Sequence, residues 1–116
     1  MSRLFHGTNA CFTSFAPRKK MSNFPDSGLI HLGYSFTPHK EYAEQFGDII
    51  LEVEVRMENP YHASKQRADE VEGMHPRSVR GWKKSLRDKG HDGVIFGKGT
   101  PVEEHVPFDA TAIHIK

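Results

Sequence analysis

Between Ile49 and Met57 the apolar and polar residues alternate strictly. Apolar residues take every second position, with charged residues between them: Ile49, Leu51, Val53, Val55 and Met57 against Glu52, Glu54 and Arg56. Successive side chains of a strand point to opposite faces, so this period of two predicts a strand with one buried face. It is the clearest strand in the chain, and Asn59-Pro60 is expected to end it.

A stripe of apolar residues at helical spacing lies further along the chain. Val79, Trp82 and Leu86 recur at intervals of three and four residues, which places them on one face of an α-helix. We expect a helix from about Arg77 to Lys89 that buries this stripe. Gly90 follows it and is a residue type that commonly ends helices.

A second helix is expected before the alternating strand. Thr37-Pro38 is a typical helix start, with threonine as the N-cap and proline at the first helical position. The helix would run from Pro38 to about Phe46 and end at Gly47.

The remaining segments indicate short strands and loops. Strands or extended segments are expected at Arg3–His6, Ile30–Phe36, Val94–Phe96, His105–Phe108 and Ala112–Ile115. The polar stretch Thr8–Ser27 indicates a long loop. The charged stretch Lys65–Met74 has too few apolar residues to be core, and we interpret it as a loop or a weakly ordered helix. Strands at both ends with helices between them predict an α+β fold with mainly antiparallel sheets and two or so helices.

Composition indicates one domain, spanning residues 1–116. A chain of 116 residues with 36% hydrophobic content can bury one modest core but not two. Sixteen Lys and Arg against fifteen Asp and Glu give a formal charge of +1, which indicates neither a nucleic-acid coat protein nor a membrane-surface protein. Basic residues are concentrated between His75 and His91. They form either a solvated helix face or a docking surface for an acidic acceptor.

Cysteine and histidine usage narrows the chemistry. The single cysteine, Cys11, excludes an intramolecular disulfide and a thiolate-rich zinc site. The eight histidines show no pair at helical ligand spacing with an acid between, so we expect no metal. No stretch is apolar enough for a signal peptide or a membrane span. These features predict a cytoplasmic protein, in its own cell or in a host or target cell.

Three separated segments carry residue types suited to a reaction. They are Phe5-His6-Gly7-Thr8, then Gly33-Tyr34-Ser35-Phe36-Thr37 with the helix that reaches Phe46, and finally Glu103-Glu104-His105-Val106-Pro107-Phe108-Asp109. Each is weak alone, and their order and spacing carry the signal. In this order the chain resembles the ADP-ribosyltransferases of the diphtheria-toxin-like and poly(ADP-ribose)-polymerase-like superfamily, including the small phage and bacterial polyvalent-protein type. The resemblance is weakest between Asn59 and Lys89.

The resemblance implies a site that binds NAD as a substrate. In that family a His-Gly pair ends the first strand, a Gly-x-Tyr-Phe segment starts the second element, an aromatic lies along the next helix and a Glu heads a late strand. By this likeness His6 would hydrogen-bond the adenosine-side ribose, and the Gly7 backbone would hold the nicotinamide carboxamide. Phe46 would stack on the nicotinamide ring, and Thr8 would add a hydroxyl contact near His6.

Glu104 is the expected catalytic carboxylate, assisted by His6. Cleavage of the nicotinamide–ribose bond develops positive charge on the ribose, which a nearby carboxylate stabilises. By resemblance Glu104 would also bind the ribose 2′-hydroxyl and orient or deprotonate the acceptor. Strand alternation sends Glu103 to the opposite face, and the family's Glu-aromatic-hydrophobic ending favours Glu104.

One position departs from the family pattern. The register against Gly-x-Tyr-Phe puts Ser35 where the family usually has a tyrosine that stacks on nicotinamide. Either one stacking face is lost, or Tyr34 takes this place after a local shift. Both Tyr34 and Ser35 are therefore candidate NAD-binding residues.

The sequence thus predicts a mono-ADP-ribosyltransferase that transfers ADP-ribose from NAD to a macromolecular acceptor, with protein favoured over nucleic acid. A role as a toxin or phage effector is suggested by the resemblance alone. Two alternatives remain open: an NAD glycohydrolase, in which water is the acceptor, and a catalytically degenerate transferase fold that acts as a binding module.

Overall fold

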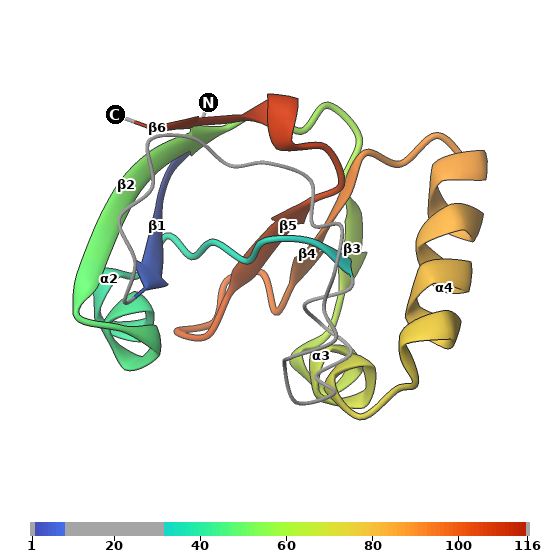
Figure 1. The fold of residues 1–116 in the computed structure, drawn as a ribbon, viewed down its shortest axis with the longest axis horizontal. Helices are drawn as coiled ribbons and strands as arrows, with labels where there is room; N and C mark the ends of the chain where they lie inside the picture. Colours follow the sequence, from blue (N-terminus) through green and yellow to red (C-terminus); the bar gives the residue numbers. More distant parts are fainter. Residues whose placement is uncertain (1, 9–31, 116) are drawn as a thin grey trace.

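A computed structural model describes residues 2–8 and 32–115. Most of the predicted Thr8–Ser27 loop and the start of the Ile30–Phe36 segment lie outside this part, as does Cys11. Two three-stranded sheets form the framework, and helices pack beside them (Figure 1). All but one of the strand pairs are antiparallel, so the predicted α+β class with mainly antiparallel sheets is confirmed.

The first sheet has the order β1-β2-β6. Strand β1 (Ser2–Thr8) pairs antiparallel with β2 (Ile49–Val55), and β2 pairs antiparallel with β6 (Ile113–Ile115). The alternating pattern therefore forms the central strand of this sheet. The strand ends at Val55, two residues earlier than the pattern suggests.

The second sheet has the order β3-β4-β5 and contains the one parallel pair among the named strands. Strand β3 (Tyr61–Ala63), which the sequence pattern does not predict, lies parallel to β4 (Gly93–Phe96). Strand β4 pairs antiparallel with β5 (Glu104–Pro107). A parallel pair needs a long crossover connection, and α3 (Lys65–Glu72) and α4 (Pro76–Asp88) supply it.

Of the two interpretations of Lys65–Met74, a loop or a weakly ordered helix, the structure shows the helix, α3, but the expectation that the segment lies outside the core is wrong. The segment is a helix, and its Ala68 and Val71 are fully buried against the second sheet. Only two small apolar side chains, three positions apart, are enough to anchor one narrow stripe of a helix. Its N-cap is Ser64, whose hydroxyl accepts a hydrogen bond of 3.1 Å from the backbone N–H of Arg67.

Helix α4 agrees with the prediction. Val79 and Leu86 are buried, and Trp82 packs against the same cluster. Proline occupies the first turn, where its missing N–H has no helical partner to lose. Gly90 follows the helix with a φ of 92°, a left-handed conformation that glycine adopts without strain.

The predicted N-cap of the preceding helix is wrong. Helix α2 (Lys40–Ala43) begins two residues later than expected, with His39 as its N-cap, and continues as the 3-10 helix η1 (Glu44–Phe46). The backbone of Thr37 is instead paired with Phe5 of β1 through hydrogen bonds of 2.8 and 3.0 Å. A residue held in extended pairing on both its N–H and its C=O cannot also start a helix.

The segment at Phe36 and Thr37 joins the two sheets. Thr37 pairs with Phe5 of β1, and Phe36 pairs with His105 of β5 through bonds of 2.9 and 2.6 Å. Phe36 is also buried in the core of the first sheet beside Leu4, Val53 and Val55. This segment therefore bridges β1 and β5, which belong to different sheets.

Candidate functional site

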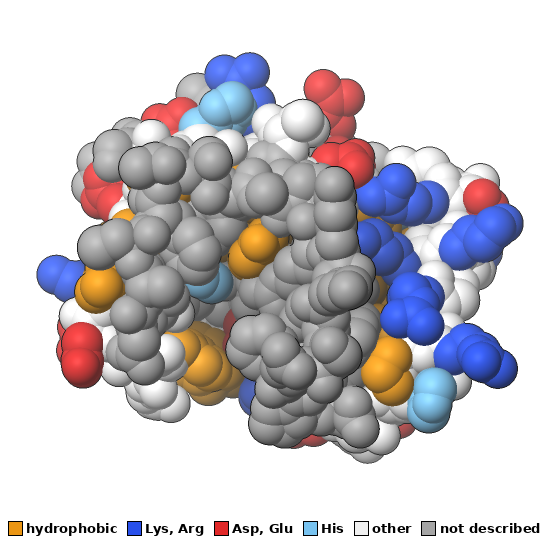
Figure 2. Space-filling view, viewed as in Figure 1, with side chains coloured by type: hydrophobic (Ala, Val, Ile, Leu, Met, Phe, Trp, Pro, Cys, Tyr) orange, Lys and Arg blue, Asp and Glu red, His pale blue; other side chains and the backbone are white. Residues whose placement is uncertain are grey.

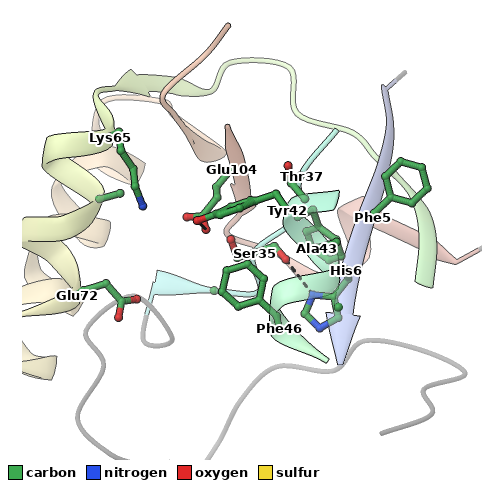
Figure 3. A pocket seen from close by; sticks show the side chains of 14 residues that line it. Phe5, His6, Ser35, Thr37, Tyr42, Ala43, Phe46, Lys65, Glu72 and Glu104 are labelled. Carbon is green, nitrogen blue, oxygen red and sulfur yellow. Dashed lines mark hydrogen bonds between the residues drawn. The ribbon is translucent and has the colours of Figure 1, made fainter. Parts of the chain in front are cut away.

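A cavity of about 440 Å³ opens where β1, α2, α3 and the start of β5 meet (Figure 3). This volume lies within the range of small-molecule sites. Its lining residues come from segments far apart in the sequence: Phe5, His6, Gly7, Gly33, Ser35, Phe36, Thr37, Tyr42, Ala43, Phe46, Lys65, Ala68, Glu72 and Glu104. Of the residues expected at the site, His6, Gly7, Ser35, Phe46 and Glu104 are brought together here.

Glu104 is buried at the first position of β5, with 5% of its surface exposed. Its Oε1 accepts a hydrogen bond of 2.9 Å from the hydroxyl of Tyr42. Its Oε2 has no hydrogen-bond partner among the described residues. A buried carboxylate oxygen left without a donor is costly, so this atom is available to a donor that a ligand brings into the cavity.

The electrostatic surroundings of Glu104 act in opposite directions. Burial raises the pKa of its carboxyl above the ordinary value of 4.5, and the carboxylates of Glu72 and Asp69 add to the rise. The hydrogen bond from Tyr42 and the nearby ammonium of Lys65 lower the pKa in part. Proton affinity raised by burial in a cavity is common at functional sites.

His6 lines the cavity from β1. Its Nδ1 is 2.9 Å from the backbone carbonyl oxygen of Ser35, and its ring packs against Phe36 at a centroid distance of 5.2 Å. A carbonyl oxygen only accepts, so Nδ1 donates its proton. In the neutral imidazole Nε2 is then an acceptor, the atom type that a ligand hydroxyl needs.

Gly7 lets β1 and α2 approach closely. A Cβ atom at this position would lie 1.9 Å from the carbonyl oxygen of Ala43, so only glycine fits. Phe5, two residues earlier, directs its N–H and C=O toward Thr37 and away from β2. Because this direction repeats every second residue in an antiparallel pair, the peptide N–H and C=O of Gly7 face the same edge, where the cavity lies.

The two aromatic candidates differ in position. Phe46, at the end of η1, is 54% exposed and lines the cavity, with its ring edge-to-face with Tyr42 at 5.1 Å. Tyr34 is not among the lining residues and packs against the core of the first sheet. Ser35 lines the cavity in place of Tyr34, so Phe46 is the one of the two candidate aromatic residues that does so.

Glu103 and Glu104 point to different surroundings, as expected from strand alternation. Glu103 accepts a hydrogen bond of 2.7 Å from the backbone N–H of Gly99 and pairs with Nε2 of His105. Burial raises the pKa of the Glu103 carboxyl, but these two contacts outweigh it and hold the pKa below 4.5. Glu103 is therefore an ionised residue that anchors the loop before β5, and it does not line the cavity.

Two further expectations concern Thr8 and the basic residues of α4. The side chain of Thr8 lies outside the described part of the chain. The basic residues of α4 are on the surface, where Figure 2 shows them gathered together, and none of them lines the cavity.

Sequence reasoning missed three polar residues of the cavity: Tyr42, Lys65 and Glu72. Tyr42 lies one helical turn before Phe46, a spacing that puts both on one face, and this was the available signal. Lys65 and Glu72 lie at the two ends of α3, and Figure 3 shows them on the side of the cavity away from His6. Burial lowers the pKa of Lys65, but Asp69, Tyr42 and Glu104 outweigh this and hold it above 10.5.

Comparisons with family models, with curated proteins and with solved structures find no match to this chain. Within residues 2–8 and 32–115, no helix is both long and apolar enough to cross a membrane. In the same residues, no three histidine, cysteine, aspartate or glutamate side chains gather as metal ligands would.

Proposed function

We propose that this protein is an NAD-dependent mono-ADP-ribosyltransferase that cleaves the nicotinamide–ribose bond and transfers ADP-ribose to a macromolecular acceptor. The observation that supports this most strongly is the unpartnered Oε2 of Glu104, buried in the wall of the cavity. The oxygen needs a donor, and a ribose hydroxyl is such a donor. A carboxylate beside the ribose is also what the chemistry requires.

The other walls of the cavity suit the remaining parts of NAD. Phe46 presents an exposed ring of the kind that stacks on a flat, partly cationic aromatic such as nicotinamide. Gly7 supplies one peptide N–H and one C=O on a strand edge, which matches the acceptor and donor of a carboxamide. His6, expected at the adenosine-side ribose, lines the same cavity.

The proposed reaction breaks the bond between ribose C1′ and the nicotinamide nitrogen. The bonding electron pair leaves with nicotinamide, which becomes neutral, and positive charge develops on the ribose. The Glu104 carboxylate, held in a poorly solvated wall, stabilises this charge more strongly than it would in water. The acceptor then bonds to C1′ and loses its proton, to Glu104 or to solvent.

The test is incubation of the wild type, Glu104→Gln and Glu103→Gln with NAD labelled in the adenosine half and with a bacterial lysate. Nicotinamide release and labelling of protein, DNA and RNA fractions are measured. The proposal expects label in one fraction, lost in Glu104→Gln and kept in Glu103→Gln, because only Glu104 lines the cavity. Free ADP-ribose without labelled product would replace the transferase by a glycohydrolase. Absence of both nicotinamide release and NAD binding would overturn the proposal and favour a binding module.

A further inference from the structure

One hydrogen bond joins two distant elements in the wall of the cavity. Tyr42 comes from α2 and Glu104 from β5, 62 residues later, and the tyrosine hydroxyl donates to Oε1 at 2.9 Å (Figure 3). It is the one hydrogen bond to the Glu104 side chain among the described residues, because Oε2 has no partner. Among the described residues, Tyr42 therefore supplies the one hydrogen bond that orients this carboxylate.

The tyrosine that makes this bond is itself held from two sides. The next residue, Ala43, is buried, and its carbonyl lies against Gly7 of β1. The Tyr42 ring meets Phe46 edge-to-face, with the ring planes at 90°. With backbone and ring both fixed, the hydroxyl is presented at a defined point rather than on a mobile side chain.

We propose that Tyr42 is a positioning residue, which holds the Glu104 carboxylate in one orientation with Oε2 turned to the ligand and stabilises its ionised form. That Oε2 accepts from a ligand hydroxyl rests on the proposed function. The effect of Tyr42 on the orientation and charge of the Glu104 carboxylate does not. Without Tyr42 both carboxylate oxygens would lack a donor from the described residues, in a wall where charge is poorly solvated.

Tyr42 acts as a donor and not as a base. Burial raises the pKa of its hydroxyl above 10.0, and the Glu104 carboxylate raises it further both by its charge and by the hydrogen bond, while Lys65 lowers it in part. The hydroxyl therefore stays protonated at neutral pH. The charged and titratable groups that face Glu104 are Tyr42 from α2 and Lys65, Asp69 and Glu72 from α3.

Removal of the hydroxyl has a direct consequence for Glu104. The bond from Tyr42 is the largest effect that lowers the pKa of this carboxyl. Tyr42→Phe keeps the ring and its contact with Phe46 but removes the donor, so the carboxyl should take up a proton at higher pH. Lys65 remains in Tyr42→Phe, but its nearby charge does not replace the hydrogen bond that Tyr42 donates to Oε1 of Glu104.

The first test needs no ligand. Glutamate carboxyl carbons are labelled with ¹³C, and the Glu104 signal, assigned with Glu104→Gln, is titrated by NMR in the wild type, Tyr42→Phe and Tyr61→Phe. Tyr61 lies on β3 away from the cavity and is the matched control. We expect the Glu104 titration to move to higher pH in Tyr42→Phe and to stay in place in Tyr61→Phe. An unchanged titration in Tyr42→Phe would overturn the proposal.

A reciprocal test covers the case in which Tyr42→Phe does not fold. Coupling between two titrating groups is mutual, so Glu104→Gln should lower the pKa of the Tyr42 hydroxyl, followed by the ring-carbon NMR signal of Tyr42. The ring-carbon signals of Tyr34 and Tyr61 serve as internal controls. A Tyr42 pKa that does not fall shows that its hydroxyl is not bound to an ionised Glu104, and the proposal fails.

Activity separates this inference from the proposed function. In an active enzyme, Tyr42→Phe should lower kcat for nicotinamide release by about tenfold at neutral pH, with a smaller change in KM for NAD, and partly recover at higher pH. An equal loss at every pH would contradict the charge effect. If the wild type releases no nicotinamide but the two titrations are coupled, the proposed function fails while the role of Tyr42 stands.

Discussion

Gly7 of β1 lies directly against the carbonyl group of Ala43 in α2, so closely that a Cβ at Gly7 would be 1.9 Å from the carbonyl oxygen and 2.9 Å from its carbon. Such a Cβ would also come within 3.3 Å of the Cβ of Phe46. This contact sets the distance between the strand that carries His6 and the helix that carries Tyr42. A glycine predicted for ligand approach thus has a packing role as well.

The first prediction is that Gly7→Ala destabilises the protein. Because both partners of the close contact are backbone, β1 or α2 must move, and overpacking of this kind costs about 1–3 kcal/mol in the free energy of unfolding. Urea unfolding measures this loss. The matched control is Gly81→Ala, an exposed position in α4 where no atom lies within 4 Å of the new Cβ, and where alanine should stabilise by roughly 0.5–1 kcal/mol. Equal stability of Gly7→Ala and the wild type would contradict the close approach.

The periodic parts of the fold were predictable because their signal is local. The alternation from Ile49 to Met57 and the stripe of Val79 and Leu86 each depend on one element facing one core. The burial of helix α3 and the strand β3 were not predictable, since both depend mainly on contacts with distant residues. Three residues, Tyr61 to Ala63, form a strand only because β4 lies beside them.

The site shows the same division. His6, Phe46 and Glu104 were identified by the resemblance, and the structure places them around one cavity. Sequence reasoning misses Tyr42, because no sequence rule relates it to a residue 62 positions away. The start of α2 was misplaced for a similar reason: pairing with Phe5 overrides the local preference of Thr37-Pro38 to begin a helix.

A second prediction separates binding from stability at Phe46. Its ring is 54% exposed, so Phe46→Ala removes little buried surface and should change the free energy of unfolding by less than about 1 kcal/mol. If the ring stacks on nicotinamide, NAD binding measured by calorimetry should weaken roughly fivefold, since an aromatic contact contributes about 1 kcal/mol. Unchanged NAD affinity would remove Phe46 from the site.

The contrasting variant is Phe36→Ala. Phe36 lines the cavity but is 1% exposed and belongs to the core of the first sheet. The loss of a buried phenylalanine costs about 3–5 kcal/mol, so this variant should unfold at far lower urea concentration than Phe46→Ala. Similar stability of the two variants would show that Phe46 is packed more tightly than its exposure indicates.

A third prediction concerns Glu103. Its pKa lies below 4.5 in the folded protein, so the carboxylate contributes stability above pH 4.5 that is lost as the pH falls through the folded value. Glu103→Gln keeps one acceptor for the N–H of Gly99 but loses the charge beside His105. We expect it to be about 1 kcal/mol less stable than the wild type at pH 7, and the difference should vanish in acid. Urea unfolding from pH 3 to pH 7 measures it.

Glu104 should behave in the opposite way. Its pKa is raised above 4.5 mainly by burial, so between pH 4.5 and the folded value the native state binds more protons than the unfolded chain. The free energy of unfolding contributed by this group therefore falls as the pH rises through that window. Glu104→Gln removes the buried charge and should gain stability relative to the wild type on going from pH 4 to pH 7, while it loses activity. We therefore expect the stability difference between variant and wild type to change with pH in opposite directions for Glu103→Gln and Glu104→Gln. If the two stability differences changed with pH in the same direction, Glu104 would be solvated. Its Oε2 would then be hydrogen-bonded to water, and the main support for a ligand at this atom would be lost.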